Sequence, residues 1–122
     1  MDQLDADVVR QWAATATTAL GSARARIDAV NVFPVPDSDT GTNVFLTVAS
    51  GTDALAGLGS GAAVAEAAVA FARGALVGAR GNSGVIVSQF LEGFALFLES
   101  RPDEGAVGPV ELAEAFEAAQ LA

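Results

Sequence analysis

The chain has 122 residues, of which 52% are apolar, so it can bury the core of one modest domain. Its formal net charge is −9, from 15 acids against 6 bases, which excludes a broad basic surface for nucleic acid or anionic membranes. The sequence contains no cysteine, histidine or lysine, which excludes disulfides, Cys/His zinc sites, histidine-based catalysis and a Walker lysine.

The sequence shows no targeting or membrane signal. The opening residues, MDQLDAD, are acidic and polar, unlike a signal peptide. The longest apolar stretch, residues 84–98, is interrupted by Ser88, Gln89 and Glu92 and is too short for a membrane span. Together with the absence of cysteine, these features predict a cytoplasmic protein with no membrane span.

The first predicted helix covers about residues 5–30, where apolar residues recur every three or four positions. The predicted buried stripe consists of Val9, Trp12, Ala16, Leu20, Ala23, Ile27 and Val30. Off that stripe, Arg24 can pair with Asp28 at i,i+4.

Residues 31–41 cannot continue this helix, because Pro34 and Pro36 lack N–H groups and force extended geometry on their predecessors. A second helix is predicted to begin near residues 40–42, where Asp39, Thr40 and Thr42 are all good N-cap types. Residues 51–61 are rich in glycine and are predicted to connect this helix to the next.

Three further helices are predicted. The third begins after Ser60 as N-cap and carries Val64, Ala68, Phe71 and Ala75 on one face. The fourth covers 84–98, with its polar residues on one side. The last begins at Pro109 and reaches Ala122 without a stop signal. We expect one all-α domain over residues 1–122, an antiparallel bundle or barrel of amphipathic helices that is incomplete at its C-terminus. Phe71, Phe90, Phe94 and Phe97 are predicted core residues.

The segment NVFPVPDSDTGTN, residues 31–43, carries the first candidate chemistry. On a loop, Asp37 and Asp39 can face one point and offer hard oxygen ligands to Mg²⁺. The alternative is that Asp39 caps a helix and Asp37 belongs to a turn. An EF-hand is excluded, because Val48 stands where its bidentate glutamate belongs.

Two glycine-containing helix starts are candidate phosphate sites, since a helix N-terminus presents unpaired N–H groups. The first is Gly41-Thr42-Asn43, and the second is GARGNSG, residues 78–84. The second matches neither the dinucleotide pattern nor the P-loop, and Ser83 has no histidine to activate it. Ser83 is also a candidate N-cap. Arg80 could supply charge to a phosphate or pair with an acid.

NVFPVPDSDTGTN and GARGNSGVIVSQFLEGF together resemble the nucleotide-binding domain of the dihydroxyacetone kinase L-subunit (DhaL) family. The NVFPVP lead-in and Thr40 are similar to the branch that contains the catalytic subunits of fatty acid kinases, FakA, whereas the dihydroxyacetone kinases carry histidine at the position of Thr40. The resemblance covers roughly residues 9–122. It implies a helical barrel that binds ATP or ADP at one end through Mg²⁺.

The resemblance also assigns roles to residues. It places metal ligands at Asp37 and Asp39, with Asn31 the nearest polar candidate for a third, and phosphate-binding loops at Thr40, Gly41, Thr42 and Asn43 and at Gly81, Asn82, Ser83 and Gly84. No catalytic base is identified.

The family further implies that the substrate arrives on another subunit. For fatty acid kinases this is an acyl-carrying, FakB-like lipid-binding protein, and the product is an acyl phosphate. A small-ketone kinase and a non-catalytic Mg-nucleotide-binding module are the alternatives. Other partners would be the remaining domains of a longer chain, and a homodimer is left open.

Overall fold

A computed structural model describes residues 5–30, 39–59, 61–100 and 109–120. Within these ranges the chain forms five helices and no strand. They are α1 (Ala6–Val30), α2 (Thr40–Ala56), α3 (Val64–Val77), α4 (Gly81–Ser100) and α5 (Pro109–Gln120). The predicted all-α fold is therefore confirmed.

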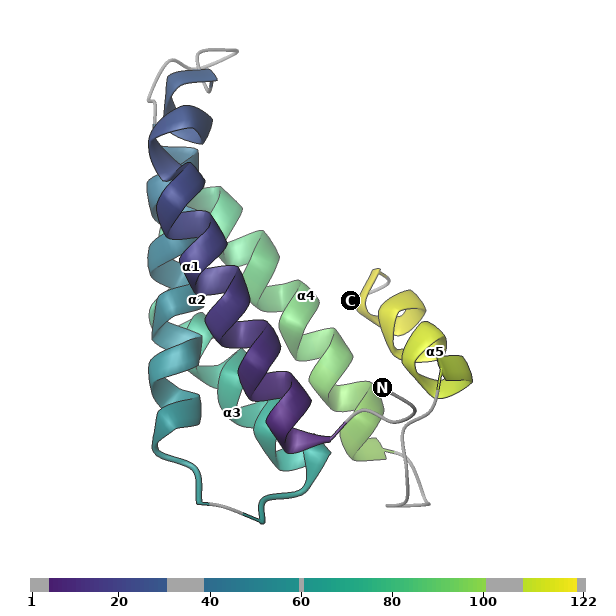
Figure 1. The fold of residues 1–122 in the computed structure, drawn as a ribbon. Coiled ribbons are helices and arrows are strands. Elements are labelled where there is room, and N and C mark those ends of the chain that lie inside the picture. Colours follow the sequence, from purple (N-terminus) through teal and green to yellow (C-terminus); the bar gives the residue numbers. More distant parts are fainter. Residues whose placement is uncertain (1–4, 31–38, 60, 101–108, 121–122) are drawn as a thin grey trace.

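Each helix packs against the next one in sequence, and α2 also contacts α4 while α1 contacts α3. The first four helices form an antiparallel bundle, and α5 lies against the end of α4 that is remote from the start of α2 (Figure 1). The end of α1 and the start of α2 lie at the same end of this bundle (Figure 1). The two sequence motifs lead into α2 and α4, and these two helices contact each other.

The core is built largely from alanine, so the helices approach closely. Ala13, Ala67, Ala75 and Ala115 are almost completely buried. Leu55, Phe94 and Leu98 add the larger buried side chains. Phe94 is thus a core residue as predicted, while Phe71, Phe90 and Phe97 are partly buried and pack against that core.

The predicted connection over residues 51–61 is wrong in its first half, because α2 continues to Ala56. Gly51 is buried inside this helix, and a Cβ atom placed on it would lie 2.7 Å from the carbonyl oxygen of Phe71. Gly74 of α3 faces it, since a Cβ there would lie 3.0 Å from the Cα of Gly51. The glycine at position 51 thus serves a helix crossing, not a turn.

The prediction that Trp12 belongs to the core is also wrong, since the residue is 40% exposed. Trp12 of α1 and Phe116 of α5 line the same open hollow. Because α1 and α5 do not pack directly on each other, the described residues leave part of the indole exposed. It borders an apolar cavity of about 80 Å³ that is also lined by Phe71, Phe90, Phe94 and Phe116. The Phe116 ring lies 5.2 Å from that of Phe94, centroid to centroid.

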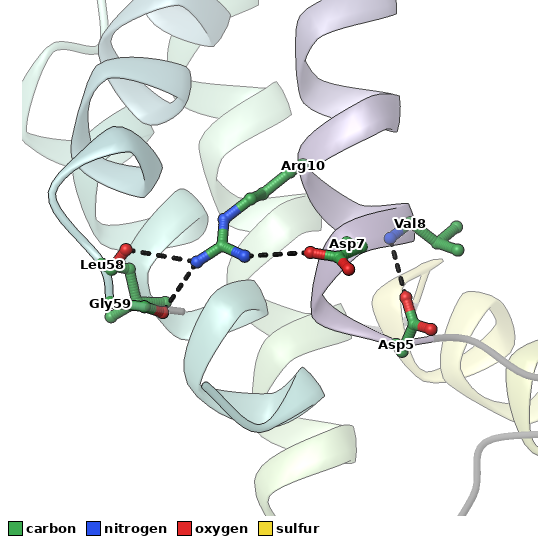
Figure 2. A network of polar contacts seen from close by, with 6 residues as sticks. All are labelled: Asp5, Asp7, Val8, Arg10, Leu58 and Gly59. Carbon is green, nitrogen blue, oxygen red and sulfur yellow. Dashed lines mark hydrogen bonds and ion pairs between the residues drawn. The ribbon is translucent and has the colours of Figure 1, made fainter. Parts of the chain in front are cut away.

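Arg10 of α1 connects this helix to the residues that follow α2 (Figure 2). Its guanidinium donates to the carbonyl oxygens of Leu58 (3.2 Å) and Gly59 (2.9 Å), just after α2 ends, and pairs with Asp7 at 3.2 Å. A cation beside the last carbonyls of a helix stabilises its C-terminus. The predicted cap Ser60 lies outside the described residues, and Ala63 is the residue before α3.

α4 is longer than predicted and differs in one polar position. Ser88, expected on the polar side, is completely buried, and its hydroxyl donates to the carbonyl of Val85 at 2.8 Å. Gln89 and Glu92 are exposed. None of the helices in the described ranges has the length and hydropathy needed to cross a membrane.

Candidate functional site

The joint between α1 and α2 is made by Asp28 and Thr42. One carboxylate oxygen of Asp28 accepts the backbone N–H of Thr42 at 3.0 Å, and the other accepts its hydroxyl at 2.6 Å. The carboxylate of Asp28 thereby caps the N-terminus of α2 from another helix. The preceding residue Asp39, predicted as the cap, makes no side-chain capping bond.

The charge of Asp28 is favoured by this arrangement. The hydrogen bond from the Thr42 hydroxyl lowers the pKa of this carboxyl below its ordinary value. The backbone N–H groups of Thr42 and Gly41 lower it further, as does the charge of Arg24, while burial acts in the opposite direction. The predicted pairing of Arg24 with Asp28 thus persists as a weak charge effect, and the Arg24 guanidinium lies over the Phe45 ring at 5.0 Å.

Replacing Asp28 by asparagine should therefore reduce stability in a pH-dependent way. Because the folded-state pKa is depressed, the contribution of Asp28 is fully present above the unfolded-state value of about 4 and disappears as pH falls through the lower folded-state pKa. Urea unfolding from pH 7 to pH 2.5 should show the wild-type advantage shrinking below about pH 4. Thr42→Val, which removes the hydroxyl that donates to Asp28, should lose part of the same pH-dependent stability. If the free energies of unfolding of wild type and Asp28→Asn change in parallel with pH, Asp28 does not cap α2 in its charged form.

Gly41 allows the two helices to meet at this joint. The residue is buried, and a Cβ atom on it would lie 2.5 Å from the carbonyl oxygen of Arg24 and 2.9 Å from the Cβ of Ile27. No side chain larger than hydrogen fits there without separating α1 from α2. Gly41 thus admits the backbone of α1, and its place in a phosphate-binding loop stays a prediction.

The second motif is joined to the first through Thr47, one turn further along α2. The Thr47 hydroxyl accepts the backbone N–H of Arg80 at 3.1 Å and donates to the carbonyl of Asn43 at 2.7 Å. Gly84 packs directly on the same hydroxyl, where a Cβ would collide with it. The structure thus brings together the two helix starts that the sequence marked as phosphate sites.

Gly81 begins α4 with a φ of +67°, in the left-handed region. Its missing side chain leaves room for the carboxamide of Asn43, which would lie 2.5 Å from a Cβ atom. The first-turn N–H groups of α4, at Gly81, Asn82 and Ser83, have no carbonyl partner within the helix. Because α4 starts at Gly81, Ser83 lies inside its first turn and is not the N-cap.

The amides of the first helix start are used within the protein. The N–H of Thr42 goes to Asp28, and that of Asn43 goes to the carbonyl of Asp39 at 2.9 Å. Thr40, the first residue of α2, is half-buried and has an interaction of its own. Of the two starts, that of α4 is therefore the better donor of N–H groups to an anion.

The predicted metal ligands are described in part. Asp39 is exposed at the start of α2, and its hard carboxylate oxygens are left free of capping, which fits a ligand of Mg²⁺. Asp37 and Asn31 lie outside the described residues. Within the described ranges, no group of three acids gathers in a way that could hold a metal.

The sequence interpretation missed two residues, Asp28 and Thr47. A signal existed for Asp28, because an acid in the last turn of a helix opposes the helix dipole and needs a positive partner elsewhere. The start of α2 supplies that partner. Thr47 carried no such signal, since a threonine within a helical pattern reads as an ordinary packed residue.

The fold and this end of the bundle define a helical domain that presents two glycine-bearing helix starts side by side. The chain belongs to the DAK2 domain family, whose model matches residues 34–122. The family consists of dihydroxyacetone-kinase-like, nucleotide-binding helical modules, so the DhaL-type resemblance is confirmed at this level.

Similar curated proteins come from staphylococci. The chain is 44% identical over 92 residues to the uncharacterized protein SH1689 of Staphylococcus haemolyticus. It is 46% identical over 92 residues to the uncharacterized protein SAUSA300_1119 of Staphylococcus aureus. Each match covers 75% of this chain, which spans only 16% of the length of these relatives.

Proposed function

We propose that this chain is the ATP- and Mg²⁺-binding domain of a kinase that phosphorylates a fatty acid carboxylate on a separate lipid-binding protein. The observation that carries the proposal is the link through Thr47, which holds the starts of α2 and α4 together. This link places an acid, Asp39, and the first turn of α4 on the same end of the bundle.

The proposed nucleotide lies with its phosphates at the start of α4. The N–H groups of Gly81, Asn82 and Ser83 and the positive end of the helix dipole favour the phosphate oxygens. The carboxamide of Asn43, beside Gly81, adds a donor from α2. Asp39 and Asp37 would hold Mg²⁺, which when bound supplies the positive charge that a chain with no lysine cannot.

The proposed reaction needs no general base from this chain. A fatty acid carboxylate is already ionised at neutral pH, so its oxygen can attack the γ-phosphorus directly. The new bond joins that oxygen to phosphorus, the bond from the γ-phosphorus to the bridging oxygen breaks, and ADP leaves with the electron pair. The role of the helix starts is to hold the phosphates in line and stabilise their charge.

Calorimetric titration of the full chain with ADP tests the proposal. We expect binding in the presence of Mg²⁺ and its loss in EDTA. Asp37→Ala and Asp39→Ala should each weaken binding by about tenfold or more, because each removes a charged metal ligand. Asp53→Ala is the matched control, since Asp53 is an exposed acid further along α2, and it should bind as wild type. An ADP affinity that is unchanged both in EDTA and in Asp39→Ala would contradict the proposed metal site.

The phosphoryl acceptor is tested separately. The dihydroxyacetone-kinase-like family favours a small ketone as the second candidate. ATP turnover by the full-length protein should rise with a fatty acid loaded on its lipid-binding protein and stay at the background level with dihydroxyacetone. The reverse pattern would assign a ketone kinase, and binding with neither turnover would assign a regulatory nucleotide-binding module.

A further inference from the structure

Thr47 is a buried polar residue that connects two separate parts of the chain. Its exposed fraction is 0%, yet it lies in the second turn of α2 at the end of the bundle that carries both motifs. Its hydroxyl accepts the N–H of Arg80 and donates to the carbonyl of Asn43, so both hydrogen-bonding capacities serve the candidate site.

The backbone N–H of Arg80 is held by its hydrogen bond to the Thr47 hydroxyl. Arg80 directly precedes Gly81, whose left-handed backbone starts α4. Gly78 and Ala79 of the turn between α3 and α4 bond back to α3, at the carbonyls of Gly74 (3.1 Å) and Leu76 (3.3 Å). Gly84 packs against the Thr47 hydroxyl from inside α4. The Thr47 side chain therefore supplies a direct hydrogen bond between α2 and the residue that precedes α4.

A second threonine in α2, the partly buried Thr52, shows that this role is not shared by every threonine of the helix. Thr52 donates to the carbonyl four residues earlier, that of Val48, at 3.1 Å, just as Thr47 does to Asn43. Its other contacts are Thr17 and the carbonyl of Ala13, both on α1. Thr52 thus matches Thr47 in residue type, helix and local bond. Within the described residues, its hydrogen bonds go to α1 and α2 and not to the start of α4.

We infer that Thr47 is a positioning residue that fixes the first turn of α4 against Asn43 and so sets the geometry of the phosphate subsite. The inference rests on the proposed nucleotide-binding function. It assigns no contact between Thr47 and the ligand, because the hydroxyl is buried and both its bonds go to protein groups.

The test compares Thr47→Val, Thr47→Ser and Thr52→Val in the full chain. ADP affinity with Mg²⁺ should fall about tenfold in Thr47→Val, the scale of one lost hydrogen bond and a displaced donor set. Thr47→Ser keeps the hydroxyl and should stay within about twofold of wild type. Thr52→Val should lose stability without losing affinity. Equal losses of affinity in Thr47→Val and Thr52→Val, or no loss in Thr47→Val, would overturn the inference.

Hydrogen exchange of the Arg80 amide, measured without nucleotide, separates this inference from the proposed function. The exchange rate should rise about tenfold in Thr47→Val and remain unchanged in Thr52→Val. If wild type binds no ADP, the proposed function fails, while the exchange result still decides whether Thr47 fixes this turn. If Thr47→Val does not fold, Gly84→Ala provides a second variant, because its added Cβ displaces the same hydroxyl from within α4. An unchanged exchange rate of the Arg80 amide in Gly84→Ala would overturn the inference.

Discussion

Replacing Gly41 by alanine should destabilise the domain and abolish nucleotide binding together. The new Cβ would lie 2.5 Å from the carbonyl oxygen of Arg24 and 3.0 Å from its Cα, and backbone atoms cannot rotate away as a side chain can. We expect a loss of about 1–3 kcal/mol in the free energy of unfolding, the usual cost of overpacking. Because the clashing atoms belong to the backbone, we expect the cost to lie in the upper part of this range, above the roughly 1 kcal/mol that alanine gains over glycine from helix propensity.

The loss of binding follows from the geometry of the joint. Separating α1 from α2 pulls Asp28 away from the N–H and hydroxyl of Thr42. The start of α2 then loses its cap, and this start carries Asp39 and Asn43 of the proposed nucleotide site. Urea unfolding and ADP titration would measure the two effects. Gly57→Ala is the control, because Gly57 has an ordinary helical φ of −81° and a Cβ there would lie 3.6 Å from its nearest neighbour. A Gly41→Ala variant as stable as Gly57→Ala would refute the close packing described at Gly41.

The helices could be predicted from the sequence because each depends on local periodicity and on strong breakers. The prolines at 34 and 36 and Pro109 correctly bounded α1, α2 and α5. Glycine was the less dependable signal. Gly51 suggested a turn, but its meaning depends on α3, a helix that begins 13 residues later and packs its Phe71 carbonyl against it.

The candidate site was predicted as two separate motifs, and their proximity is the part that sequence alone did not give. The contact between Asp28 and Thr42 spans 14 residues, and that between Thr47 and Arg80 spans 33. Such pairs depend on how helices pack, which no local spacing encodes. The motif residues themselves were recognisable because asparagine is rare in this alanine-rich chain and because two aspartates and two prolines gather within residues 34–39.

Replacing Gly81 by alanine should impair nucleotide binding more than stability, and Gly61 provides a matched comparison. Both glycines have a positive φ, +67° at Gly81 and +85° at Gly61, so alanine at either costs about 1–2 kcal/mol of backbone strain. At Gly61 nothing lies within 4 Å of the added Cβ, whereas at Gly81 the Asn43 carboxamide lies 2.5 Å away. Only the Gly81 variant therefore displaces a proposed phosphate donor.

The two variants should accordingly show similar free energies of unfolding in urea and different affinities for ADP. Because the backbone of Gly81 both starts α4 and leaves room for Asn43, we expect Gly81→Ala to lose affinity by about 100-fold, the equivalent of roughly 2.7 kcal/mol. Gly61→Ala, in the turn at the opposite end of the bundle, should bind as wild type. Equal affinities would show that the start of α4 does not hold the phosphates, even if the domain binds nucleotide elsewhere.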